Sequence, residues 1–180
     1  MPKFKRRLSP SRLAGEKPQR LPARPAADEA FIAGRTVLML GETLMHMTPY
    51  LYFKGTCEAA LKFYESCGLG KIQELRRFEG TLMEQRAGPG WRDKILHSVF
   101  EGPGVRLCAS DGIDSEPMKG CAIFIENDDV HEAKSLFDAL SAGGRITVAF
   151  TKQFWGDQDG NFTDKFGVQW AVNCHPSGES

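Results

Sequence analysis

The sequence predicts an α+β domain built from two βαββ(β) modules with curved mixed β-sheets. Three observations predict it. A chain of 180 residues suits one ordinary core. Two amphipathic helical stretches repeat 73 positions apart, and each follows a short strand pattern and precedes several more strands. Because a helix with one apolar stripe must cover it, we expect each helix to pack on the sheet of its own half.

The two predicted helices span residues 57–67 and 130–142. Their apolar residues recur at i, i+3, i+4 and i+7, which marks a buried face. These residues are Ala60, Phe63, Tyr64 and Cys67 in the first helix and Ala133, Leu136, Phe137 and Leu140 in the second.

The helix ends have their own signals. Thr56 is the expected cap of the first helix, and Asp129 with Glu132 predicts a capping box on the second. Glycines at 68 or 70 and at 143–144 predict the two C-terminal ends.

The strands are expected in two sets, at 49–53, 71–78, 95–101 and 105–109, and at 121–126, 145–150, 162–164 and 168–173. The 73-residue offset is expected to bring the first strand of each set into register. Asp159-Gly160 and Phe166-Gly167 predict tight turns between the last strands, and Asp164 and Lys165 are expected to set the second one. Residues 88–93 predict a loop in which Trp91 acts as a lid or packs on the surface.

We expect three regions: a basic, Pro-rich, disordered extension at residues 1–44, the folded domain at 45–175, and a tail at 176–180. Residues 1–27 hold eight Lys or Arg against one acidic residue. This segment has too few apolar residues to offset the entropy of ordering, so we expect it to be dispensable. An organellar transit peptide, or translation that begins at Met45 or Met47, are the alternatives.

Composition also bears on partners and compartment. The basic segment lacks the interleaved aromatic residues of a nucleic-acid site and the period of a membrane helix, so we expect neither partner. The apolar run at residues 36–40 is too short to be a secretory or membrane segment. The five cysteines lack the two-residue spacing of zinc or redox pairs, which predicts reduced thiols and a cytoplasmic protein.

Two segments resemble a known family. Residues 152–173, with their two glycine turns and aromatic strand pattern, and residues 48–64 are similar to the PhnB-like branch of the vicinal oxygen chelate superfamily, which includes glyoxalases and bleomycin-resistance proteins. The resemblance covers residues 47–173. It implies sheets that curl around a ligand cleft, and a homodimer in which a second subunit covers the cleft.

The resemblance also implies where a metal would be held in relatives that use one. The matching positions are Tyr50 or Tyr52 on the first strand, residues 107–109 on the fourth, Cys121 on the fifth and Ala171 on the last. Because the usual His, Gln or Glu ligands are missing from these positions, we expect no metal and no other cofactor.

Seven residues are candidates for ligand binding: Tyr50, Tyr52, His97, Gln153, Trp155, Asp157 and Trp170. His97 could be a lone ligand, a general base or a hydrogen-bond donor, or simply a satisfied strand histidine. The aromatic residues could line an apolar pocket. The alternative is core or dimer packing, which is the stronger interpretation for Trp170.

The leading hypothesis is a small-molecule-binding protein without the full metal site of its superfamily. The alternative is a lyase, isomerase or dioxygenase-like enzyme with a reduced metal site around His97. Some relatives carry the label demethylubiquinone methyltransferase, but no glycine-rich strand-to-helix turn of a methyl-donor fold is visible.

Overall fold

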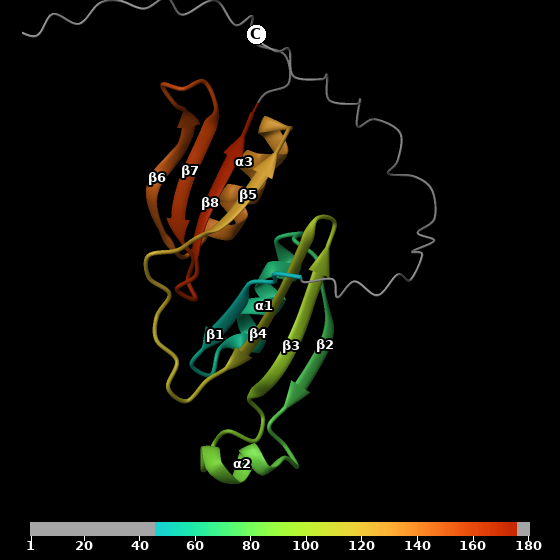
Figure 1. Ribbon diagram of the computed structural model, residues 1–180. Helices are drawn as coiled ribbons and strands as arrows, with labels where there is room; N and C mark the ends of the chain where they lie inside the picture. Colours follow the sequence, from blue (N-terminus) through green and yellow to red (C-terminus); the bar gives the residue numbers. More distant parts are fainter. Residues whose placement is uncertain (1–45, 176–180) are drawn as a thin grey trace, which may run out of the picture. The chain divides into compact units, whose positions relative to one another are not determined.

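A computed structural model describes residues 46–175 (Figure 1). The chain divides into two units, Met1–Leu44 and Met45–Ser180, and the described residues belong to the second. The expectations for the basic extension and for the tail at 176–180 therefore lie outside the described residues.

The first module contains β1 (Tyr50–Phe53), α1 (Cys57–Ser66), β2 (Lys71–Arg77), α2 (Leu82–Ala87), β3 (Ile95–Gly102) and β4 (Val105–Asp111). Its strands form one sheet in the order β1-β4-β3-β2. The β1–β4 pair is parallel, and the other two pairs are antiparallel.

The second module contains β5 (Ile123–Asn127), α3 (Val130–Ser141), β6 (Arg145–Lys152), β7 (Gln158–Thr163) and β8 (Gln169–Cys174). Its sheet has the equivalent order β5-β8-β7-β6, with β5 parallel to β8. Because the order and the directions match those of the first sheet, the prediction of two βαββ(β) modules is confirmed.

The 73-residue offset holds for the helices but is wrong for the first strands. Ala60 and Ala133 are both buried, as are Tyr64 and Phe137. The same offset would align buried Leu51 with Phe124, which is 55% exposed. Three residues separate β1 from α1, and two separate β5 from α3. Since side chains alternate along a strand, that one-residue difference moves the match in the strands to an offset of 74.

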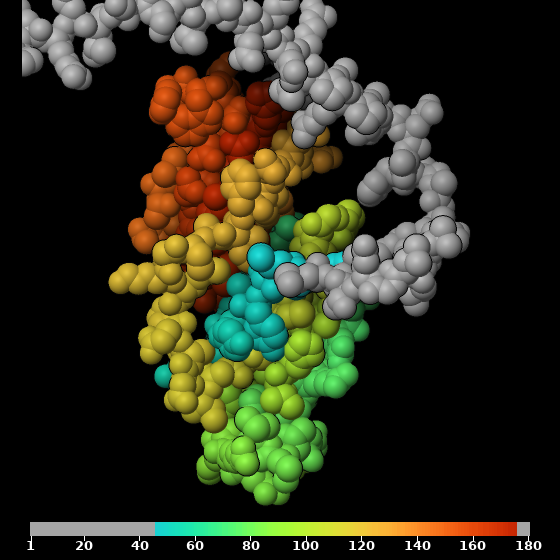
Figure 2. All heavy atoms as spheres, viewed as in Figure 1, coloured from blue at the N-terminus to red at the C-terminus, as the bar shows by residue number. Residues whose placement is uncertain are grey.

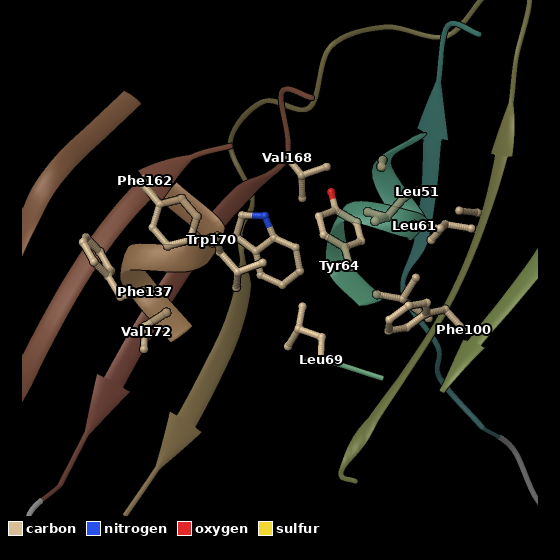
Figure 3. Close-up of a cluster of buried hydrophobic side chains, with 14 of the residues drawn as sticks. Leu51, Leu61, Tyr64, Leu69, Phe100, Phe137, Phe162, Val168, Trp170 and Val172 are labelled. Atoms are coloured by element: carbon tan, nitrogen blue, oxygen red, sulfur yellow. The ribbon is translucent and has the colours of Figure 1, made fainter. Parts of the chain in front are cut away.

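The two modules meet at an aromatic contact in the core (Figure 3). The rings of Tyr64 on α1 and Trp170 on β8 lie edge to face, with centroids 5.4 Å apart. The buried carboxylate of Asp164 accepts hydrogen bonds from Tyr64 Oη at 2.7 Å and from Trp170 Nε1 at 3.0 Å. It also accepts from the amides of Phe166 and Val168, so Asp164 sets its turn as expected.

The turn predicted at Asp159-Gly160 is wrong, because both residues lie inside β7. The reversal before β7 occurs at residues 153–157, where Gln153 N donates to Asp157 O and Gly156 has a φ of 110°. Gly160 is required for a different reason. A Cβ there would lie 2.6 Å from the ring of Phe137 and 2.9 Å from Phe150 Cα.

The segment between β2 and β3 contains a helix that the sequence analysis missed. Thr81 accepts a hydrogen bond from Glu84 N and begins α2, a six-residue helix without a buried residue. Its lack of an apolar stripe removed the usual signal. The predicted loop follows it, and Trp91 packs edge to face against Phe78 with ring centroids 5.4 Å apart.

The predicted caps were partly right. Asp129 accepts from the amides of His131 and Glu132, but Asn127 rather than Glu132 accepts from Asp129 N, so there is no capping box. The prediction for Thr56 is wrong, since its side chain makes no capping hydrogen bond. Asp111, at the end of β4, accepts from Cys57 N in its place.

Candidate functional site

The first sheet has one face covered by α1 and one open face. Leu51 and Phe53 of β1 are buried, whereas the alternating Tyr50 and Tyr52 are exposed. The space-filling view shows the atoms around β1, in blue-green, at the surface (Figure 2). Because neighbouring strands keep the same alternation, the open face can be followed across β4 and β3.

Three predicted residues meet on this open face. The rings of Tyr50 and Tyr52 are stacked, with centroids 4.8 Å apart and planes 28° apart. The ring of half-buried His97 lies 5.9 Å from that of Tyr50. Tyr50 Oη and His97 Nδ1 are 3.1 Å apart and hydrogen-bonded. Two strands 47 positions apart in sequence thus build one aromatic cluster, which we call the tyrosine–histidine cluster (Tyr50, Tyr52 and His97).

Ser110 lies on β4, next to the cluster. Its residue is 6% exposed, and Tyr52 is its partner in the β1–β4 register. Burial raises the pKa of Tyr50, and the nearby Ser110 hydroxyl opposes the rise.

The rest of the open face is mixed in character. Half-buried Cys108 is opposite Tyr50 in the β1–β4 register. Two ion pairs, between Arg76 and Glu74 and between Arg106 and Glu101, lie on β2 and across β3–β4. The guanidinium groups of Arg76 and Arg106 are therefore already paired with carboxylates. Tyr52 also lines a small hollow of about 450 Å³ with residues 112 and 114–116.

Three other predicted residues lie at the β6–β7 reversal of the second module. Phe154 and Trp155 are both exposed at its tip and lie edge to face. The Gln153 amide nitrogen donates to Thr151 O and Asp159 O. Asp157 is hydrogen-bonded to His175 Nδ1 at 2.6 Å, and this contact holds the pKa of the Asp157 carboxyl below the usual range. Within residues 46–175, no hydrogen bond, ion pair or ring contact links this group to the tyrosine–histidine cluster.

Trp170 lies apart from both groups, in the core between the modules. Its indole is 2% exposed and donates to Asp164. Trp170 also contributes to the wall of a groove of about 730 Å³ between residues 105–107 of β4 and 123–127 of β5. Tyr50, Tyr52 and His97 are not part of that wall.

Two polar residues near the site were missed from the sequence. The predicted fourth strand ended at residue 109, so Ser110 and Asp111 fell outside it. The strand in fact extends to Asp111. The signal was present in the alternation of residues 107–111, since Cys108 and Ser110 share one face while Leu107, Ala109 and Asp111 share the other.

The family model described as 3-demethylubiquinone-9 3-methyltransferase matches residues 45–173. A structure titled as a putative 3-demethylubiquinone-9 3-methyltransferase, PhnB protein, from Bacillus cereus is 21% identical, with a TM-score of 0.62 over 73% of this chain and 100% of that one. The chain belongs to this PhnB-like family.

The chain is also similar to three other proteins. Protein PA1353 from Pseudomonas aeruginosa is 34% identical, with a TM-score of 0.66 over 74% of this chain and 100% of that one. Protein YjdN from Escherichia coli K12 is 29% identical over 72% of this chain and 95% of its own length. A glyoxalase/bleomycin resistance protein/dioxygenase domain from Frankia sp. EAN1pec, at 11% identity and a TM-score of 0.53, shows the same fold.

The residues present do not fit the metal site of the superfamily. On the open faces, the first strands offer Tyr50, Tyr52, Phe124 and the single carboxylate of Glu126, and the last strands offer Cys108, Ser110, Ala171 and Asn173. Within residues 46–175, no three His, Cys, Asp or Glu side chains are grouped closely enough to hold an ion. The Asp111 carboxylate is committed to the amides of Gly55, Cys57 and Ile95.

The strand-to-helix turns bear on the methyltransferase named in the family description. The β1–α1 turn has one glycine, Gly55, whose amide donates to Asp111 and whose carbonyl accepts from Lys94 Nζ. The β5–α3 turn is Asp128-Asp129, with Asp129 capping the helix. Neither turn has the glycine-rich backbone that brings a nucleotide-like cofactor close. Across the described part of the chain, no helix is long and apolar enough to cross a membrane.

Proposed function

We propose that this PhnB-like protein binds a small molecule on the open face of its first sheet. The observation that carries the proposal is the tyrosine–histidine cluster: two stacked, exposed tyrosines with a hydrogen-bonded imidazole on a face that no helix covers. Flat aromatic faces give a planar ligand a large contact area, and the histidine adds a directional polar contact. Binding without turnover is the simplest use of this arrangement.

A homodimer is part of the proposal. Exposed apolar side chains on the strands include Tyr50, Tyr52, Phe124, Ile146 and Val148. A second copy that covered these residues would remove apolar surface from water and enclose the ligand. The polar residues Gln153 and Asp157 and the exposed Trp155 of the second module would then contribute to a ligand pocket. Trp170 would contribute as well if the pocket reached the core groove.

Native mass spectrometry of the purified full chain, combined with elemental analysis, tests the proposal. We expect a dimer mass, a bound or added small molecule, and far less than one equivalent of metal per chain. Stoichiometric metal that disappears in His97→Ala would instead support the metal-dependent enzyme.

Variants locate the site. We expect Tyr52→Ala and His97→Ala to abolish the binding of planar aromatic fragments, measured by ligand-observed NMR. Phe154→Ala is the control, since Phe154 is an even more exposed aromatic residue, at the β6–β7 tip. Equal binding by all three variants would place the ligand elsewhere and overturn the proposal.

A further inference from the structure

The open face of the first sheet changes in chemical character from one edge to the other. The strand order β1-β4-β3-β2 puts the two tyrosines of the cluster at one edge and Arg76 at the other, with His97 of β3 between them (Figure 1). His97 is hydrogen-bonded to Tyr50 on one side and is the register partner of Arg76 on the other. Side chains directly opposite each other on neighbouring strands share a face, with Cβ atoms about 4.5–5.5 Å apart. The face therefore runs from aromatic rings through an imidazole to a guanidinium group.

Arg76 is available to a ligand although it forms an ion pair. Its side chain is 70% exposed, and its contact with Glu74 on the same strand is made by Nε. Within residues 46–175, neither terminal nitrogen of the Arg76 guanidinium forms a hydrogen bond. These nitrogens carry most of the N–H donors of an arginine, in a planar fork that matches the two oxygens of a carboxylate. An exposed ion pair of this kind is weak, so Glu74 orients the guanidinium and leaves its terminal donors free.

Acidic residues next to the tyrosines favour one orientation of a charged ligand. Asp114 and Glu116 line the hollow beside Tyr52, which lies on β1. β1 and β2 are three strand spacings apart, about 14 Å. A negative group on a ligand is repelled at the acidic end of the face and attracted at Arg76. A flat ring that lies on the tyrosines would therefore direct its negative group across His97 toward Arg76.

We infer that Arg76 is a specificity-determining residue of the site and that the ligand is a planar aromatic carboxylate. Its ring lies against Tyr50 and Tyr52, and its carboxylate accepts hydrogen bonds from the terminal nitrogens of Arg76. This inference rests on the proposed function, which places a planar ligand on the tyrosine–histidine cluster. Arginine stays charged at every physiological pH, so Arg76 adds a permanent positive charge that the cluster lacks.

A matched pair of planar probes tests the ligand class. Cinnamate and cinnamamide have nearly the same shape, but only cinnamate carries a negative charge. We expect the full-length protein to bind cinnamate about tenfold more tightly, the value of one charge-assisted hydrogen bond. Ligand-observed NMR measures both affinities. Equal affinities would overturn the inference and leave the proposed function standing, whereas binding of neither probe would overturn both.

Arg76→Gln tests the arginine. It removes the charge and keeps a polar side chain, so we expect cinnamate affinity to fall about tenfold and cinnamamide affinity to stay unchanged. Arg106→Gln is the matched control, because Arg106 is also an exposed, ion-paired arginine of this sheet. Its register partner is Glu101, four residues from His97 along β3, or about 13 Å. We expect the control to leave both affinities unchanged. Equal losses in the two variants would indicate a general effect of charge and overturn the role of Arg76, as would full cinnamate affinity in Arg76→Gln.

NMR of the guanidinium groups gives a test that does not depend on the glutamine variant. The ¹H–¹⁵N signals of the Arg76 terminal nitrogens are assigned through their loss in Arg76→Lys. We expect saturating cinnamate, but not cinnamamide, to shift these signals in the wild-type protein, because a carboxylate would accept from both N–H groups of the fork. If Arg76→Gln fails to fold, this measurement decides. Unshifted Arg76 signals in the presence of bound cinnamate would overturn the inference.

Discussion

Asp111 organises the start of the first module through one side chain. Its Oδ1 accepts from Gly55 N at 2.8 Å and Cys57 N at 3.0 Å, and its Oδ2 accepts from Ile95 N at 2.9 Å. The residue is 4% exposed. A buried carboxylate is tolerated when amide donors replace its water, and here those donors belong to the β1–α1 turn and the start of β3. One residue therefore fixes the β1–α1 turn against the start of β3.

We predict that Asp111→Ala lowers the free energy of unfolding by about 3 kcal/mol, because two buried amides and one partly buried amide lose a charged acceptor. Urea unfolding followed by circular dichroism measures it. Asp114→Ala, at an exposed position three residues later, is the control and should change stability by less than about 0.5 kcal/mol. Similar losses in the two variants would contradict the role assigned to Asp111.

At the scale of single elements, α1 is tied to the end of β2 by charge. Glu58 in its first turn contacts Arg77 at 2.9 Å and Lys62 at 2.8 Å. Hydrogen bonds from Arg77 and then Lys62 lower the Glu58 pKa to about 2. The ion pairs are partly exposed, so their contribution is modest.

This pair predicts a pH dependence. Because the folded-state pKa is lower than the unfolded one, the stabilisation is complete above about pH 4.5 and is lost as the pH falls toward about 2. We expect Glu58→Gln to be less stable than the wild-type protein at pH 7, by under about 1 kcal/mol, and the difference to disappear near pH 2. Glu116→Gln, at an exposed loop position, should show no such trend. A difference between Glu58→Gln and the wild type that is constant with pH would contradict the explanation.

The strand β7 passes so close to α3 that one position excludes a side chain. We predict that Gly160→Ala costs about 1–3 kcal/mol, because its Cβ would overlap the ring of Phe137 and the backbone of Phe150. Gly112→Ala is the control, since its new Cβ would meet Ser115 Cβ at an acceptable 3.4 Å. Thermal unfolding of both variants measures the difference, and equal melting temperatures would show that β7 can move away from α3.

For the whole molecule, the junction of the two modules is polar at its centre. Tyr64 is fully buried, and burial, followed by the neighbouring Asp164, raises its pKa far above the usual value. The phenol therefore stays protonated and donates to Asp164, as does Trp170. Apolar packing surrounds this network, so both modules share one core.

We predict that Tyr64→Phe destabilises the protein by about 1.5–3 kcal/mol, because a buried carboxylate loses a donor. Denaturant unfolding followed by tryptophan fluorescence reports on Trp170 at the junction. Tyr52→Phe removes the same hydroxyl from an exposed position and should have little effect. Comparable stabilities for the two variants would show that the Asp164 network contributes little to joining the modules.

The sequence predicted the modules because their signals are local: helical spacing around Ala60 and Ala133, and glycines at the turns. It placed Tyr50 and Tyr52 on one face by alternation. It could not predict that His97 would meet Tyr50, since this depends on the order β1-β4-β3 and on the register between distant segments. Nor could it find the role of Gly160, which depends on a ring from α3.

The unequal strand-to-helix turns matter for anyone who would rebuild this molecule by copying one half onto the other. A transplant of the tyrosine pair at the helical offset of 73 would fall on Ile123 and Ile125, which face the core. The productive positions are Phe124 and Glu126, one residue later in each case, and both are exposed. The one-residue difference in turn length thus decides which strand positions of the two modules are equivalent.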